Sequence, residues 1–222
     1  MKTSRLIRTF NDRYPLVGPS FWILSVQYFV AQFVVARHWT TAFSLSRNTI
    51  SDLGNTVCGP YGGRLVCSPL HDWMNASFIL LGLTMIIGSG LIYHEFRRGT
   101  ASRIGFGFMA VAGFGTVLVG LFPENTVSTL HILGAALPFL IGNIGIVVLG
   151  LILELPHTLK IYTVLSGLIA LVALVFFTTG HYLDLGVGGM ERLTGYPQTL
   201  WLIVFGLYMS SNRFGSKSKG VI

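Results

Sequence analysis

The feature that most constrains this chain is a series of six long apolar stretches. They cover 17–36, 73–93, 104–122, 131–153, 161–180 and 196–211. A helix needs about 20 residues to cross roughly 30 Å of hydrocarbon, and most of these stretches are close to that length. The apolar residues in these stretches are continuous. The strands of a membrane barrel would instead alternate between apolar and polar residues. We therefore expect an all-α polytopic membrane protein, a bundle of six transmembrane helices.

The composition agrees with a membrane protein. Of 222 residues, 52% are hydrophobic and only 10% are charged, whereas soluble domains carry about 25% charged residues. The net charge of +7 does not indicate nucleic acid, because the basic residues are not interleaved with aromatic residues on one face. Membrane lipids are the expected surroundings, and no nucleic-acid partner is expected.

The positions of the basic residues predict the orientation, since cytoplasmic loops carry an excess of Lys and Arg. With the N-terminus inside, 11 of the 15 Lys and Arg lie on the inner side. We expect both termini to be cytoplasmic, in a multi-pass protein of the cell (cytoplasmic) membrane whose first stretch is retained. Three parts follow: a basic cytoplasmic N-terminus at 1–16, a six-helix transmembrane domain at 17–211, and a basic cytoplasmic tail at 212–222.

Both cysteines, Cys58 and Cys67, lie in one outer loop at 37–72, in a Gly-rich segment. The exterior of a cell is oxidising, and an even pair of cysteines there is typical of a disulfide. We predict that these two are bonded, with two free thiols as the alternative. The same loop is the expected contact for any protein partner.

Side chains capable of acid, base or ligand chemistry gather in the three outer connections, each of which supplies at least one His and one carboxylate. The candidates for catalysis are Asp52, Asp72, Glu124 and Ser128. The candidates for metal binding are His71, His131 and His181. Histidines and carboxylates from separate hairpins at one membrane depth suit a divalent metal such as zinc, or general acid and base catalysis.

Simpler roles compete with these. Pro123 suits the first turn of a helix, which would place Glu124, Ser128 and His131 on one face. An acidic residue at that position also serves as a helix cap. Each histidine taken alone fits a hydrogen-bonded, interfacial role as well as ligation.

The stretch 104–122 is rich in Gly and Ala. Small residues let helix backbones approach closely in lipid, where apolar burial drives little association. We expect this helix to be central and to pack against the stretch 131–153 through Gly134, Gly142 and Gly145. A homodimer face is the alternative.

Three motifs together resemble a known family: S-D-L-G-N after the first stretch, G-L-F-P-E-N after the third, and a histidine that opens the fourth. They are similar to those of the bacterial and archaeal integral membrane proteins grouped as domain of unknown function 998. The resemblance covers roughly 16–211 and implies a six-span helical protein of the cytoplasmic membrane, without an activity to carry over. The residues that match are Ser51, Asp52, Leu53, Gly54, Phe122, Pro123 and His131.

Three functions remain open from the sequence. The first is a metal-assisted hydrolase or transferase that acts on a lipid or isoprenoid headgroup at the outer face. The second is a non-catalytic scaffold or accessory subunit, in which the outer polar residues tie the hairpins together. The third is a small-molecule permease, which is disfavoured because none of the six stretches carries an ionisable residue near its middle.

Overall fold

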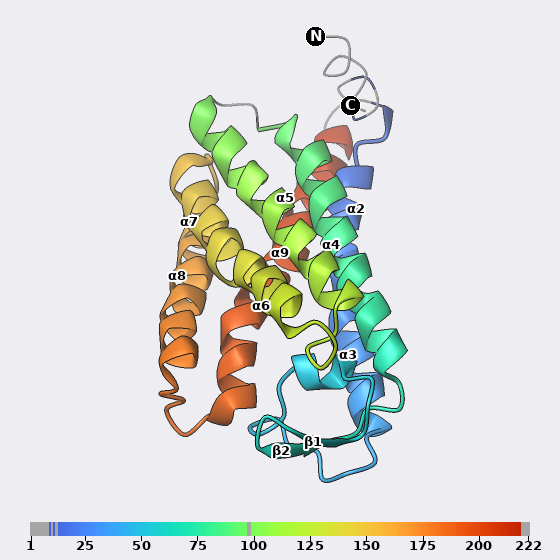
Figure 1. Ribbon diagram of the computed structural model, residues 1–222. Helices are drawn as coiled ribbons and strands as arrows, with labels where there is room; N and C mark the ends of the chain where they lie inside the picture. The colour runs from blue at the N-terminus through green and yellow to red at the C-terminus, as the bar shows by residue number, and fades with distance from the viewer. Residues whose placement is uncertain (1–8, 10, 12, 97–98, 219–222) are drawn as a thin grey trace.

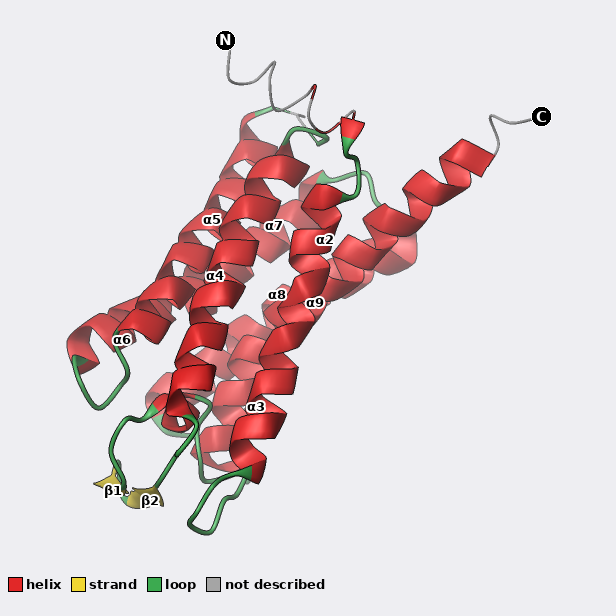
Figure 2. Ribbon diagram, turned by 90° about the vertical axis from the view of Figure 1, so that its right-hand side faces the viewer, coloured by secondary structure: helices red, strands yellow, loops and turns green. Residues whose placement is uncertain are grey.

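A computed structural model describes residues 9, 11, 13–96 and 99–218. Most of the expected N-terminal segment and the last residues of the expected C-terminal tail lie outside these residues. The described chain is a helical bundle with a small hairpin at one end (Figures 1 and 2). Its elements are α2 (Val17–Ile23), η1 (Leu24–Val26), α3 (Gln27–Arg37), η2 (Ser51–Gly54), β1 (Gly59–Tyr61), β2 (Arg64–Val66), α4 (His71–Tyr93), α5 (Thr100–Leu121), α6 (Ser128–Ala136), η3 (Leu137–Gly142), α7 (Asn143–Ile152), α8 (His157–Thr179) and α9 (Gly186–Ser218).

Five helical stretches of the described chain are long and apolar enough to cross a membrane: 17–37, 71–93, 100–121, 128–152 and 157–179. They confirm an integral, multi-pass helical membrane protein. The first is α2, η1 and α3 in series, with a 3-10 turn in the middle. The fourth is α6, η3 and α7 in series, and η3 is a π-helical segment that contains Pro138.

The sixth expected stretch, 196–211, lies inside the longer helix α9. This helix runs the length of the bundle beside α2 and α8 (Figures 1 and 2). It is not among the five apolar stretches, and its first turns carry the buried residues Glu191 and Arg192. The helix begins ten residues before the expected stretch because these polar side chains find partners in the segment 44–52, as described below.

Close approaches at glycine residues organise the middle of the bundle around α5. A Cβ atom on Gly113 would lie 2.6 Å from the carbonyl oxygen of Gly82 on α4. On the other side of α5, a Cβ on Gly134 of α6 would lie 2.9 Å from the carbonyl oxygen of Gly115, and one on Gly145 of α7 would lie 3.0 Å from Phe108. The expected packing of this helix against the stretch 131–153 is therefore confirmed.

The hairpin of β1 and β2 is closed by a disulfide between Cys58 and Cys67, as predicted. It lies at the end of the bundle that also carries η2 and the turn 122–127, and we call this end the loop end (Figure 1). Helix α2 begins and α9 ends at the opposite end (Figure 1).

One expected helix start is wrong. Pro123 and Glu124 do not begin a helix; they lie in a turn in which the amide of Thr126 donates to the carbonyl of Pro123 at 2.9 Å. Helix α6 begins at Ser128. Glu124 is therefore neither a helix cap nor part of a helical face with Ser128 and His131.

The glycine contacts predict a position-dependent effect of adding one methyl group. Gly113→Ala should lower the free energy of unfolding in detergent by about 1–3 kcal/mol, because the methyl group meets the α4 backbone and the helices must separate. Gly107→Ala on the same helix is the control, since no atom lies within 4 Å of the added Cβ. It should be neutral or slightly stabilising. Equal thermal shifts for the two variants would contradict the proposed packing.

Candidate functional site

An ion pair anchors the loop end of the bundle. The fully buried carboxylate of Asp52 on η2 accepts hydrogen bonds from Arg64 Nε at 2.6 Å and from Arg64 Nη2 at 2.7 Å. This two-bond geometry is the strong form of an Arg–carboxylate pair. The backbone amide of Thr49 also donates to Asp52, at 2.9 Å. Arg64 lies on β2, so the pair ties the disulfide-closed hairpin to η2.

Glu124 lies next to this pair. The turn that carries it is fixed to the hairpin by the Tyr61 hydroxyl, which donates to the Glu124 carbonyl at 2.8 Å. Burial, a hydrogen bond with Asp52, and the negative charges of Asp52 and Glu191 raise the pKa of Glu124 to about 9. At neutral pH Glu124 therefore holds a proton, and its Oε1 has no hydrogen-bond partner among the described residues.

Asp52 takes the opposite protonation state. Burial alone would raise its pKa, but the hydrogen bonds from Arg64 and from the protonated Glu124 outweigh burial, so the pKa of Asp52 lies below its ordinary value. One carboxylate and one carboxylic acid thus lie side by side, as expected when two such groups share a site that contains a single arginine.

A second chain of hydrogen bonds joins three elements. His131 on α6 lies 2.8 Å from the carbonyl oxygen of Phe122 through Nδ1 and 3.0 Å from the Ser51 hydroxyl through Nε2. Ser51 also lies 2.9 Å from Glu191 Oε1 on α9, and the amide of Ile50 donates to Glu191 Oε2. The chain therefore runs from Phe122 through His131 and Ser51 to Glu191.

Donor and acceptor counting fixes how many protons this chain holds. A carbonyl oxygen only accepts, so His131 Nδ1 carries a hydrogen. The Ser51 hydroxyl has one hydrogen, which it can donate to His131 or to Glu191 but not to both. The two hydrogen bonds of Ser51, to His131 and to Glu191, then require one further proton. Either Glu191 holds it as a carboxylic acid or His131 holds it as an imidazolium. In the first state Ser51 donates to a neutral His131 Nε2, and the buried chain carries no charge.

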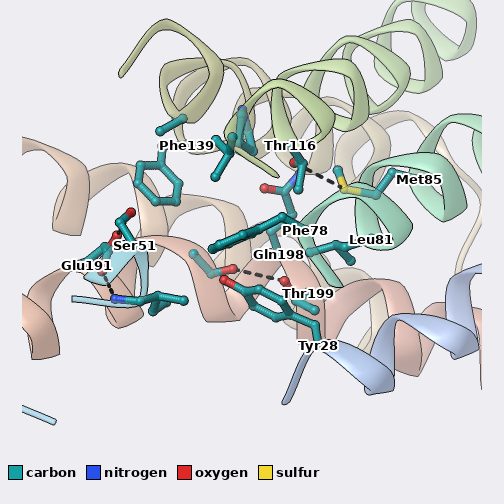
Figure 3. A pocket seen from close by; sticks show the side chains of 15 residues that line it. Tyr28, Ser51, Phe78, Leu81, Met85, Thr116, Phe139, Glu191, Gln198 and Thr199 are labelled. Carbon is teal, nitrogen blue, oxygen red and sulfur yellow. Dashed lines mark hydrogen bonds between the residues drawn. The ribbon is translucent and has the colours of Figure 1, made fainter. Parts of the chain in front are cut away.

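Ser51 and Glu191 also line a cavity of about 50 Å³ inside the bundle. Figure 3 shows the two side chains together on one side of this pocket, away from Thr116 and Met85. The rest of its wall is mostly apolar and aromatic: Tyr28, Phe78, Leu81, Val119 and Phe139. The cavity is large enough for several water molecules or a short piece of alkyl chain.

The structure brings together three of the residues predicted from the sequence, namely Asp52, Glu124 and His131. The others lie elsewhere. Two of them pair with each other at the start of α4, where His71 Nε2 is 3.4 Å from the exposed Asp72. Ser128 is exposed at the start of α6, and His181 is exposed after α8.

The expected zinc ligands are therefore not gathered. The His71 ring lies 2.9 Å from the carbonyl of Ser68, and the buried His131 ring is bonded to a serine hydroxyl and a backbone carbonyl. Within the described ranges, no group of three or more His, Cys, Asp or Glu side chains could hold a metal ion. A site made of His71, His131 and His181 would need a rearrangement of the loop end.

We call the side chains of Ser51, Asp52, Arg64, Glu124, His131 and Glu191 the Ser51 cluster. Three of them were not among the candidates from the sequence: Ser51, Arg64 and Glu191. Ser51 belongs to the S-D-L-G-N motif, so the motif was the available signal. Glu191 follows the third outer connection, but its partners Ile50 and Ser51 are about 140 residues away in sequence. Nothing local distinguishes it from an ordinary solvated glutamate.

Comparison with known proteins identifies a family. The sequence model of the family described as "Protein of unknown function (DUF998)" matches residues 23–208. No curated protein and no solved structure matches the chain. The matched range contains every residue of the cluster around Ser51.

The raised pKa of Glu124 predicts a pH-dependent stability. Between about pH 4.5 and pH 9 the folded protein keeps a proton that the unfolded chain has lost. The free energy of unfolding should therefore fall as pH rises through this range, by at most about 1.4 kcal/mol per pH unit. Glu124→Gln should reduce this slope in detergent unfolding titrations from pH 5 to pH 9, and any slope that remains belongs to the proton held by Glu191 or His131. An unchanged slope in the variant would assign the proton to another group.

Proposed function

The chain belongs to the DUF998 family, and for this member we propose a hydrolase or transferase activity on an ester bond in the headgroup of a lipid or isoprenoid. Ser51 is the nucleophile in this proposal and His131 is its general base. The carrying observation is the 3.0 Å contact between Ser51 Oγ and His131 Nε2, at the edge of a cavity.

The contacts of His131 support this role. A serine hydroxyl becomes nucleophilic when an adjacent base takes its proton, and the base must be held in the correct tautomer by a third group. The carbonyl of Phe122 does this by accepting from Nδ1, which leaves Nε2 free to accept from Ser51. A backbone carbonyl here takes the place that a carboxylate has in a Ser-His-Asp triad.

The proposed reaction has two steps. Ser51 Oγ attacks the carbonyl carbon or phosphorus of the ester, its proton passes to His131 Nε2, and the alcohol leaves with that proton as the ester bond breaks. Water or a second alcohol then attacks the Ser51 ester, His131 accepts its proton, and Ser51 is released with the proton returned. Glu124, which is protonated at neutral pH, is the nearby acid that can assist the leaving group.

The position of the cluster supports a lipid substrate. It lies at the loop end, where the hydrocarbon-facing parts of α3, α4 and α6 meet the polar hairpin. A headgroup ester at the membrane surface would be at the same depth as Ser51. The mostly apolar wall of the adjoining cavity suits the first carbons of a chain.

We also propose that α9 is the sixth span and that both termini are cytoplasmic, which places the cluster at the outer face. The support is the length of α9, its course beside α2 and α8, and the excess of Lys and Arg that the sequence has in the expected inner segments. An oxidising exterior also agrees with the disulfide in the hairpin.

One observation favours a second candidate, a non-catalytic scaffold or accessory subunit that binds a protein partner through its outer loop. The same hydrogen bonds that could activate Ser51 also connect η2, α6 and α9. Glu191 accepts from the amide of Ile50 and is also bonded to Ser51, and Asp52 accepts from Arg64 and Thr49. Because its groups are paired in this way, the cluster can stabilise the loop end by joining η2, α6 and α9.

Substitution of the dyad separates the two functions. Ser51→Ala should lower turnover of a fluorogenic lipid ester in detergent micelles by at least about a thousandfold, because the nucleophile is absent. Its thermal midpoint should stay near that of the unaltered protein. Ser46→Ala is the control, since Ser46 is exposed in the same loop and outside the cluster.

Two other outcomes would change the assignment. No turnover in the unaltered protein, together with a lower thermal midpoint for His131→Gln, would favour the scaffold. Activity that is lost on treatment with a chelator and restored by zinc would favour a metal centre of His71, His131 and His181. The Ser51 mechanism expects a chelator to have no effect.

The topology is tested by single cysteines in a variant that lacks Cys58 and Cys67. A cysteine at Gly63, in the turn of the hairpin, should react with a membrane-impermeant maleimide added to intact cells. A cysteine at Ser216, near the end of α9, should react only after the cells are opened. Labelling of both from outside would contradict a sixth span.

A further inference from the structure

A second cavity lies at the loop end, and its lining shares no residue with that of the cavity beside Ser51. It is an open groove of about 380 Å³ between α3, the segment 43–53 and α9. We call it the α3–α9 groove. Its wall includes Phe29, Gln32, Phe33, Arg37, Arg192 and Tyr196.

Two buried side chains in this wall have unused hydrogen-bond donors. Arg192 is 7% exposed, and its Nη1 donates to the carbonyls of Leu45, Asn48 and Gly188, yet its Nε has no partner in the described chain. Gln32 is 6% exposed and its Oε1 accepts from the Tyr196 hydroxyl at 2.7 Å, but its Nε2 has no described partner either.

The unused atoms are all of one kind. Arg192 Nε and Gln32 Nε2 are both N–H donors, and Arg192 also carries a full positive charge. A buried donor without an acceptor costs about 1–3 kcal/mol, and the cost is greater where lipid rather than water surrounds the protein. The described residues that line the groove include no Asp or Glu to accept from these donors. A ligand that only accepts hydrogen bonds, and that is negatively charged, would complete this wall.

The rest of the groove is suited to an apolar chain. Phe29 and Phe33 flank Gln32 on α3, and Phe33 is 67% exposed. At the rim, the guanidinium of Arg37 lies over the Phe33 ring, 5.9 Å from its centre. Arg37 is thus a second cation, after Arg192, and it lies at the rim end of the Phe29 and Phe33 surface.

We propose that the α3–α9 groove binds an oxyanion, a phosphate or carboxylate, carried on an amphiphile whose chain lies along Phe29 and Phe33. The Arg192 and Gln32 donors, which are covered in the ligand-free structure, turn toward the oxyanion, and Arg37 adds charge at the rim. This site is separate from the Ser51 cluster: on α9, Glu191 lines the inner cavity, whereas Arg192 and Tyr196 line the groove. The proposal does not depend on the activity proposed above.

The test measures binding of dodecyl phosphate to the full-length protein in dodecyl maltoside, which has the same chain and an uncharged head. Calorimetry should show saturable binding of dodecyl phosphate. Gln32→Met should raise its Kd about tenfold, because the side chain keeps its approximate length but loses the donor. Gln32 is chosen because Arg192 also holds three backbone carbonyls, so its replacement could unfold the loop end.

The matched control is Gln198→Met. Like Gln32 on α3, Gln198 on α9 is a buried glutamine whose Nε2 has no partner among the described residues. It lines the cavity beside Ser51 and not the groove. Its replacement should leave the Kd of dodecyl phosphate unchanged. If Gln198→Met weakens binding and Gln32→Met does not, the phosphate is in the inner cavity and the groove proposal is wrong.

Inorganic phosphate distinguishes the two sources of the oxyanion. Binding of dodecyl phosphate that is at least about a hundredfold tighter than that of inorganic phosphate would identify a lipid site. Comparable Kd values that both rise in Gln32→Met would identify a site for the free anion. Absence of saturable binding of either, or a Gln32→Met variant that binds like the unaltered protein, would overturn the proposal.

Discussion

The first turns of α9 are bonded to the segment 44–52, and the geometry of the loop end depends on that junction. The amide of Gly188 donates to the carbonyl of Ser46 at 2.8 Å, and Arg192 donates to the carbonyls of Leu45 and Asn48. Gly188 has no side chain, so the segment can lie directly against the helix. The junction satisfies carbonyl groups that would otherwise be buried without partners, and it places Ser51 between α6 and α9.

The buried acids of the loop end are not all paired with a base. Arg64 pairs with Asp52. Glu124 lies beside this carboxylate and is not itself paired with a cation, so it keeps its proton. Glu191 is bonded to neutral groups and shares one proton with His131 through Ser51. The cluster therefore stores protons where a surface site would be ionised, because burial makes a second negative charge costly. The same proton inventory suits acid and base catalysis, and it also explains how such a polar cluster can be stable in a small membrane protein.

The apolar stretches predicted most of the bundle because a membrane helix must satisfy its backbone internally and must be long enough to cross. The start of α9 was missed because Glu191 and Arg192 look like loop residues. Charged side chains usually remain in water, and the partners that bury these two are distant in sequence. The disulfide was predictable because both cysteines lie in one outer loop.

Depth in the membrane could be estimated from the sequence, but position around the bundle could not. His71, His131 and His181 all lie near the same end, as expected from the spans. Only His131 faces the cluster, because the direction of a side chain depends on the rotation of its helix and on the order in which helices pack. The expected metal set assumed that equal depth means proximity, and this assumption failed for His71 and His181.

The π-helical segment Leu137–Gly142 has a consequence for how His131 is aimed. A π turn contains about one residue more than an α turn, so it rotates the helix before it relative to the helix after it by about 100°. Helix α7 is locked in place by Asn143, whose Nδ2 donates to Phe139 and Thr194. The extra residue therefore makes the rotation of α6 about its axis independent of the packing of α7 on α5. In one continuous α-helix His131 would point about 100° away from its present direction, so its contact with Ser51 depends on the π-helical segment that begins six residues later.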